Sequence, residues 1–275
     1  NHILPKLGDI KIKDLKRDKL INCILEVKLK STRGDGYETK QRIFIILKDI
    51  LNYIAIQGII QDYISPLAGF KFNNICKDKH IVANHRFIKD PTKLKEFLTA
   101  IDNYKGNIYT KYALKLGTYT ALRSGTIRAL KWEYIDFTQN IINIPAELMK
   151  MKKPFILPIS SQAKAILKEL EAYRLGVYLF STNSKIMSEN TLNKAIKILG
   201  FGDEATFHGF RGLFSTICHD NTQDHGLTSE VIELCLDHTD KNKVRSAYNK
   251  SERLQEKANL MEWYGNYIDN LKNDK

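Results

Sequence analysis

Cysteine is scarce and scattered in this 275-residue sequence. The cysteines form neither a Cys-x-x-Cys pair nor a Cys/His ligand spacing, so the sequence indicates no zinc site and no disulfide framework. We expect all of them to be small core residues in a reducing cytoplasm. They are Cys23, Cys76, Cys218 and Cys235.

Long apolar runs are also missing. No stretch approaches the roughly 18 consecutive apolar residues that a membrane-spanning helix needs. No signal-peptide pattern opens the chain, and we find neither an internal repeat nor a low-complexity tract. We therefore expect a globular protein with no membrane partner.

Acidic residues are fewer than basic residues. Lys and Arg total 43 against 31 Asp and Glu, which gives a formal net charge of +12. Such a surplus favours a polyanionic partner, most commonly nucleic acid, although a basic enzyme with a solvated lysine surface is the alternative. The hydrophobic share of 43% is typical of a folded protein, and the length suits one large domain or two ordinary ones.

The first part of the chain has helical periodicity. Apolar residues recur at three-and-four spacing over 39–57, and Gly58 is expected to end that helix. Asp14 is placed to cap an earlier helical segment, which ends near the loop at 31–36 and carries Leu20, Ile21, Ile24 and Leu25. The segment 71–87 is polar and weakly periodic, so we predict a linker there and a domain boundary near residue 87.

The second part is predicted to be helical with one small sheet. Asp90-Pro91 opens a helix, with a capping carboxylate and a proline at the first position. Two runs rich in β-branched residues, 141–144 and 155–159, indicate strands joined by a polar turn. Further helices are expected after Ser160 or Ser161, over 189–199, after Thr228 and over 254–268.

Five short stretches of this second part carry residues suited to phosphate chemistry. Each residue alone has an ordinary structural explanation, such as a surface cation, a helix-end histidine or a packed tyrosine. Their order along the chain is what makes them notable. They are Arg123, Lys150, the pair His208 and Arg211, His238, and Tyr248 ten positions after His238.

This order is similar to that of the tyrosine recombinases, the phage integrase family, and most of all to integrases of satellite phages and genomic islands. The stretches Thr206–Arg211 (TFHGFR) and Val244–Asn249 (VRSAYN) carry the resemblance, with Met-Glu-Trp-Tyr at 261–264. The fold it implies is mainly α with a small β-sheet. A helical, SAM-like core-binding domain would span 1–87, and a mixed α/β catalytic domain would span 88–275.

The resemblance also implies a role for each residue. Tyr248 would attack the scissile phosphate and form a 3′-phosphotyrosyl bond. Arg123 and Arg211 would clamp the phosphate oxygens, because a guanidinium donates two parallel hydrogen bonds to an oxygen pair.

The remaining roles concern protons. Lys150 would protonate the leaving 5′-oxygen, His208 would be the general base for the tyrosine, and His238 would donate to the phosphate. Lys152 is the alternative to Lys150, since strand alternation would place both on one face. We expect no metal and no ATP, because these cations supply the positive charge and the phosphotyrosyl bond conserves the backbone energy.

The implied function is site-specific recombination of a mobile element in the bacterial cytoplasm, at the nucleoid. The partners would be double-stranded DNA at attachment sites and a homo-tetramer on that DNA, with a monomer in solution allowed. A dimer-resolving recombinase, a type IB topoisomerase-like enzyme and an inactive DNA-binding regulator are the alternatives.

Some features depart from the family pattern or stay open. Thr126 stands where the family commonly has a supporting glutamate, and Asp237 precedes His238 where glycine is usual. The final helix could dock on a neighbouring subunit or pack on its own domain. Because the chain begins at Asn1 and shows no arm-binding domain, we expect a fragment, or else a natural protein without that domain.

Overall fold

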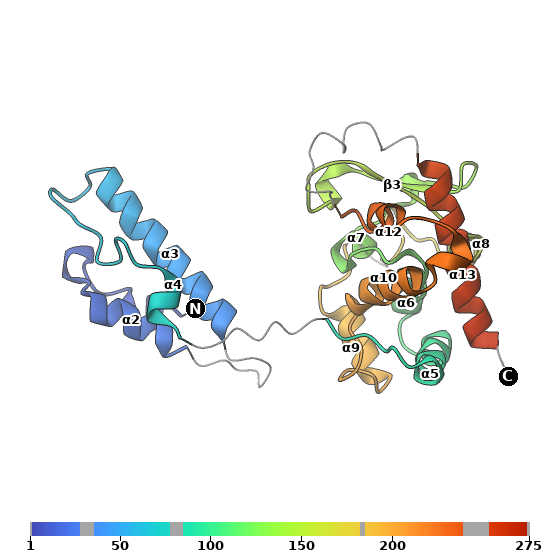
Figure 1. Ribbon diagram of the computed structural model, residues 1–275, viewed down its shortest axis with the longest axis horizontal. Helices are drawn as coiled ribbons and strands as arrows, with labels where there is room; N and C mark the ends of the chain where they lie inside the picture. The colour runs from blue at the N-terminus through green and yellow to red at the C-terminus, as the bar shows by residue number, and fades with distance from the viewer. Residues whose placement is uncertain (1, 28–35, 78–84, 182–184, 239–252, 274–275) are drawn as a thin grey trace. The chain divides into compact units, whose positions relative to one another are not determined.

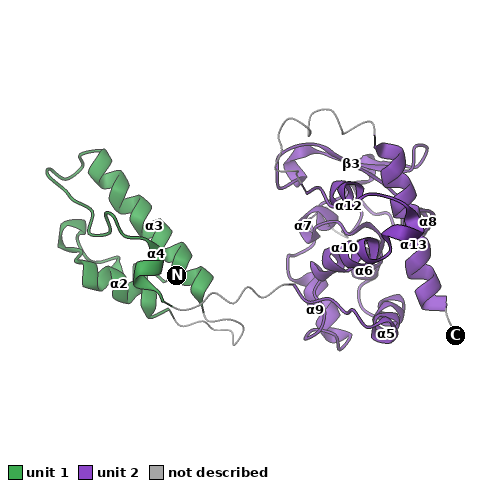
Figure 2. Cartoon of the chain, in the orientation of Figure 1, with its two compact units in different colours: residues 1–84 green, residues 85–275 purple. Residues whose placement is uncertain are grey.

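The computed structural model describes residues 2–27, 36–77, 85–181, 185–238 and 253–273 (Figure 1). The chain divides into two compact units, residues 1–84 and 85–275 (Figure 2). This division falls after Asn84, whereas the sequence places the boundary near residue 87. In the part of the chain that the structure describes, no helix has the length and apolar character to cross a membrane.

Unit 1 is helical. Its long helix α3 agrees with the predicted periodicity, because Ile43, Leu47 and Leu51 are buried on one face. Gly58 follows the helix in a left-handed conformation, with φ at 61°, as its position predicts. The described elements are α1 (Leu4–Leu7), η1 (Ile12–Asp14), α2 (Arg17–Leu25), α3 (Tyr37–Ile56) and α4 (Phe72–Ile75).

Two expectations for unit 1 are wrong. Asp14 does not cap α2, because it lies in the 3-10 helix η1 and α2 begins only after Lys16. The beginning of the expected linker is instead part of the core. Phe72 and Cys76 are buried, and the ring of Phe72 meets that of Tyr37 edge-on at 5.1 Å between centroids.

Unit 2 begins with caps that the sequence predicts. The Asp90 Oδ1 atom accepts a hydrogen bond from Lys93 N at 2.8 Å, and Ser160 Oγ accepts one from Ala163 N at 3.2 Å. These bonds satisfy backbone N–H groups that have no partner inside the first turn of a helix. The helices before the strands are α5 (Pro91–Asp102), α6 (Ile108–Thr120), α7 (Ser124–Arg128) and η2 (Trp132–Tyr134).

The small sheet is antiparallel, in the order β1-β2-β3. Ile142 pairs with Leu157 and both are buried, whereas their neighbours Asn143 and Ile156 face solvent. This alternation is the reason why residues 141–144 and 155–158 of the two apolar runs form strands. The elements are β1 (Ile135–Asp136), β2 (Ile141–Ile144), η3 (Ala146–Leu148) and β3 (Phe155–Pro158).

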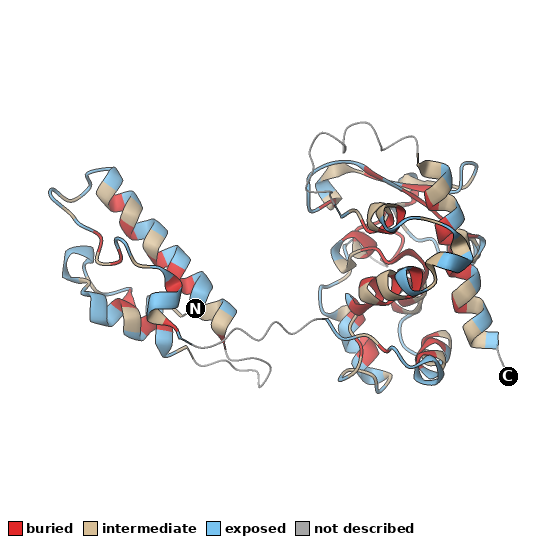
Figure 3. Cartoon of the chain, viewed as in Figure 1, coloured by how far each residue is buried: buried red, intermediate tan, exposed pale blue. Residues whose placement is uncertain are grey.

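Helices enclose the core of unit 2, and the last of them belongs to that core. Buried residues gather on the inner faces of the helices of unit 2 (Figure 3). Leu260, Met261 and Tyr264 of α13 are fully buried, and the Tyr119 hydroxyl of α6 donates to Asp269 of α13. The final helix therefore packs on its own unit. The helices after the sheet are α8 (Ser161–Glu171), α9 (Thr191–Ile198), α10 (Gly209–Asp220), α11 (Thr222–His225), α12 (Ser229–Cys235) and α13 (Leu254–Asn273).

Replacing Gly117 by alanine should destabilise unit 2, since the new Cβ would lie 2.4 Å from Cζ of Phe207. Overpacking costs about 1–3 kcal/mol, part of which the better helix propensity of alanine offsets. Urea denaturation followed by circular dichroism measures the change. Gly125→Ala is the matched control, because nothing lies within 4 Å of its added Cβ. Equal stability of the two variants would contradict the close α6–Phe207 packing.

Candidate active site

The site is built around the first turn of α10. Phe207 and Phe210 are buried in the core of unit 2, and this packing fixes the rotation of the helix about its axis. Arg211 then points into the interior, where it is only 6% exposed. Thr206 Oγ1 accepts a hydrogen bond from Gly209 N at 3.1 Å, which closes the turn before the helix.

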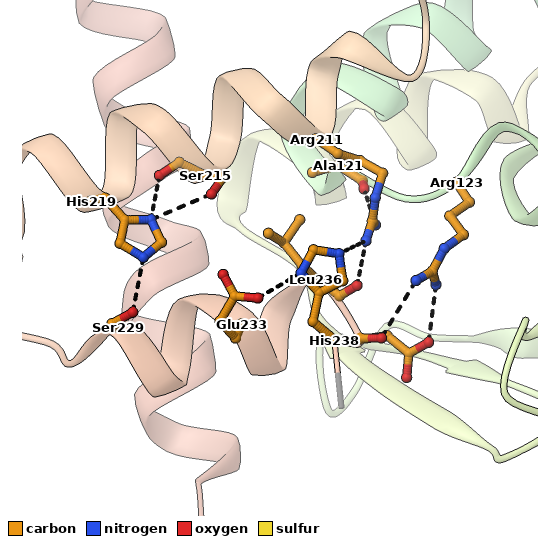
Figure 4. A network of polar contacts seen from close by, with 10 residues as sticks. Ala121, Arg123, Arg211, Ser215, His219, Ser229, Glu233, Leu236 and His238 are labelled. Carbon is orange, nitrogen blue, oxygen red and sulfur yellow. Dashed lines mark hydrogen bonds and ion pairs between the residues drawn. The ribbon is translucent and has the colours of Figure 1, made fainter. Parts of the chain in front are cut away.

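The guanidinium of Arg211 links two helix ends (Figure 4). NH1 donates to the carbonyl of Ala121 at 2.9 Å, and NH2 donates to the carbonyl of Leu236. Ala121 follows α6 and Leu236 follows α12, so both oxygens belong to the negative ends of helices. Burial and the nearby charge of Arg123 lower the pKa of Arg211 to about 10, which still leaves it protonated at neutral pH.

Arg123 lies directly after one of these helix ends and pairs with Asp237, which lies after the other. The Arg123 NH1 atom is 3.0 Å from Asp237 Oδ2, and its NH2 group lies 3.4 Å from the Asp237 carbonyl. Asp237 adopts a left-handed conformation with φ at 50°, which aspartate tolerates better than most residues. In this conformation the carboxylate of Asp237 faces Arg123.

His238 lies between Arg211 and an acidic residue of α12. Its Nε2 is 3.0 Å from Arg211 NH2, and its Nδ1 is 2.6 Å from Glu233 Oε2. Because a guanidinium can only donate, Nε2 accepts in this arrangement and Nδ1 carries the hydrogen. This tautomer is assigned from the hydrogen-bond network. Glu233 thus orients the ring of His238.

His208 lies one helical turn before Arg211, with part of its side chain open to solvent and part covered. Partial burial lowers its pKa to about 4, and the charges of His85, Arg211, Arg123 and His238 add to that effect. The side chain is therefore neutral at physiological pH, and a neutral imidazole can accept a proton. His208 is the residue before α10 and Arg211 lies in the first turn of that helix, where it contacts His238.

Lys150 lies apart from these contacts, on the exposed connection between β2 and β3. The strands end at Ile144 and restart at Phe155, so strand alternation cannot place Lys150 and Lys152 on one face. They belong to a turn, in which Lys152 has φ at 52° and its Nζ donates to the Glu147 carbonyl at 3.3 Å.

The buried Met149 and a bond from Thr126 Oγ1 to the Leu148 carbonyl at 3.2 Å anchor the segment that precedes this turn. Thr126 therefore supports the lysine-bearing connection. Its hydroxyl does not hold Arg123, the role in which the family commonly uses a glutamate at this position.

Tyr248 lies outside the described residues. Sequence reasoning missed the roles of Glu233, Asp237 and the two carbonyl oxygens that hold Arg211. The sequence marked Asp237 only as a departure from the family pattern, which has glycine before the histidine. Every residue has a backbone carbonyl, so the sequence cannot indicate which of them accept from Arg211. Among the described residues, no three His, Cys, Asp or Glu side chains gather in the way that a metal ion would require.

Replacing Arg211 by methionine should destabilise unit 2, because the carbonyls of Ala121 and Leu236 are buried and would lose their donors. Each unsatisfied group costs about 1–3 kcal/mol. Arg211→Lys should recover part of the loss, since it can reach only part of this acceptor set. Urea denaturation measures the free energy of unfolding, which should fall in the order wild type, Arg211→Lys, Arg211→Met. Arg174→Met, at an exposed position, is the control, and a similar loss there would contradict the structural role of Arg211.

Known proteins resemble this chain in sequence. Residues 89–254 match the model of the phage integrase family. The chain is 30% identical to the integrase of Enterobacteria phage P4, over 99% of this chain and 63% of that protein. It is 28% identical to prophage integrase IntA of Escherichia coli K12, over 97% of this chain and 62% of that protein. The chain thus spans less than two thirds of these relatives.

Solved structures share the fold. A lambda integrase tetramer bound to a Holliday junction superposes with a TM-score of 0.64 and 18% identity, over 89% of this chain and 67% of that one. The pre-cleavage complex of the XerH site-specific recombinase with its difH substrate gives 0.62 and 17%, over 86% and 70%. With the family match over more than half of its length, this chain belongs to the phage integrase family, the tyrosine recombinases.

Proposed function

We propose that this chain breaks and rejoins DNA as the site-specific recombinase of a mobile element. Tyr248 would carry the covalent 3′-phosphotyrosyl bond. One observation carries the proposal: Arg123 and Arg211, far apart in the sequence, meet at the ends of α6 and α12, where His238 lies 3.0 Å from Arg211 and His208 lies one turn before it. Two guanidinium groups next to a neutral imidazole suit a phosphate whose charge grows during the reaction.

Phosphate binding would use donors that the network leaves available. A guanidinium has five N–H donors, and the described contacts of Arg211 use three of them. Arg123 presents its donors to Asp237, a carboxylate that a phosphate would have to replace or share. Asp237 therefore competes with the substrate for Arg123 while it stabilises a cluster of like charges.

Proton transfer would use His208 as the base and a lysine as the acid. The phenol of Tyr248 loses its proton to His208 Nδ1 or Nε2, and its oxygen forms a bond to phosphorus. The P–O bond to the 5′-oxygen breaks, and that oxygen takes a proton from Lys150. Rejoining reverses each transfer. Lys150 is the better candidate than Lys152, whose ammonium donates to the Glu147 carbonyl.

The partners follow from the family. The lambda integrase structures show a tetramer on a Holliday junction and a dimer on a COC′ core site. We propose that this chain likewise binds double-stranded DNA and assembles as a tetramer on it, with unit 1 as the core-binding domain and unit 2 as the catalytic domain. The net charge of +12 supports binding to the phosphate backbone. The protein would act at the bacterial nucleoid.

Tyr248→Phe should abolish covalent attachment to DNA while leaving DNA binding within about twofold, because the phenol oxygen is the nucleophile. A nicked suicide duplex with the ends of the element traps the adduct, which is then read on a denaturing gel. Wild-type protein should shift the labelled strand. An adduct that persists in Tyr248→Phe, or that never forms with wild type, would disprove the mechanism.

Asp237→Ala should have two opposite effects. Stability should fall by about 1–3 kcal/mol, since a partly buried charge-assisted bond is lost. Affinity for duplex DNA should rise at the same salt concentration, because a carboxylate that competes for Arg123 is gone. Fluorescence anisotropy and urea denaturation measure the two quantities. Glu189→Ala is the control, as that carboxylate lies 85% exposed beside Arg128. A loss of affinity in Asp237→Ala would refute the competition.

A further inference from the structure

The first residues of unit 2 pack against the start of α10. The carbonyl of Arg86 accepts a hydrogen bond from Thr206 N at 3.1 Å, and Arg86 NH1 donates to the carbonyl of Asp203 at 2.5 Å. These contacts are mostly to backbone, so they fix the path of the chain over 85–87. The segment thus lies on the turn that carries His208.

Two glycines of α10 permit this approach. A Cβ added at Gly209 would lie 2.1 Å from the Arg86 carbonyl oxygen, and one at Gly212 would lie 2.8 Å from the ring of Phe87. Any larger residue at Gly209 would therefore push the segment away, because a backbone oxygen cannot move aside as a flexible side chain can. The glycines in His-Gly-Phe-Arg-Gly provide a seat for 85–87.

This seat brings a second imidazole to the candidate base. The ring of His85 lies against the ring of His208, with centroids 4.1 Å apart and planes inclined by 46°. The other groups that act on His208 are Arg211 of α10, Arg123 beside α7, and His238 after α12. All of them are cationic or can become so, and none is an acid that would stabilise a protonated His208.

We propose that His85 is a positioning residue for this reaction, which holds the ring of His208 and keeps it neutral for proton transfer from Tyr248. The inference rests on the proposed function, in which His208 is the general base. The covering ring removes water from one face of His208, and water is what would otherwise solvate an imidazolium. A proton on His85 would add a further positive charge beside it.

The pH dependence follows from the sign of the shift. The pKa of His208 is lowered to about 4, mainly by partial burial and then by His85, so its neutral form prevails above that pH. Without the covering ring, the pKa should rise towards the ordinary value of about 6.5. His208 would then be protonated over part of the range between these values. Cleavage should fail on the acid side and stay near normal at alkaline pH.

His85→Ala and His85→Phe test this in the full chain. NMR of histidine-labelled protein, assigned with His208→Asn, gives the pKa of His208, and suicide-duplex cleavage from pH 5 to pH 8 gives the profile. In His85→Ala we expect a raised pKa and cleavage at pH 5 that is lower by on the order of fivefold relative to pH 8. His85→Phe keeps a ring in place, so its His208 pKa and its cleavage profile should lie closer to those of wild type.

The control is His219→Ala, an exposed histidine near the far end of α10, which should leave the His208 titration and the profile unchanged. An unaltered His208 pKa in His85→Ala would overturn the inference. Should His85→Ala fail to fold by circular dichroism, His85→Phe decides. A His208 pKa near the ordinary value of about 6.5 in that variant would count against the packing role. Absence of any wild-type adduct would refute the proposed function, while the NMR titration would still test the contact between His85 and His208.

Discussion

A buried guanidinium organises the candidate active site. Arg211 cannot lose its proton at neutral pH, and a charge in the interior requires acceptors on every side that water cannot reach. The ends of α6 and α12 provide them as the carbonyl oxygens of Ala121 and Leu236. Arg123 follows the first of these ends, and Asp237 and His238 follow the second. One buried cation thereby fixes the starting points of three side chains.

Acidic residues hold two side chains of the site, and carbonyl oxygens hold a third. Arg123 pairs with Asp237 and His238 pairs with Glu233, whereas the described contacts of Arg211 are to neutral groups. Partial burial is the main cause of the lowered pKa of His208, and the nearby charges of His85, Arg211 and Arg123 add to it. Asp237 and Glu233 orient Arg123 and His238, so the two acids help to fix the geometry of the site.

Periodicity and caps predicted much of the helical structure, since they depend on neighbours within one turn. Asp90, Ser160 and Gly58 act at the helix ends where local rules place them. The failures have a common cause. Asp14 lies in an intervening 3-10 helix, and Phe72 packs in the core of unit 1 against Tyr37. The turn around Lys150 is present as predicted, but both lysines lie outside the strands, so strand alternation does not relate Lys150 to Lys152. In each case contacts or turns decided what local composition could not.

The sequence by itself determined the family resemblance, the mainly helical fold and the kinds of side chain available for phosphate chemistry, because these depend on residue order and periodicity. Only the tertiary structure decided how those side chains are held. Asp237 meets Arg123, His85 meets His208, and α13 packs on its own unit through contacts between residues far apart in the chain. No local pattern encodes such pairs, since their distances are set by how whole helices pack and where each one ends.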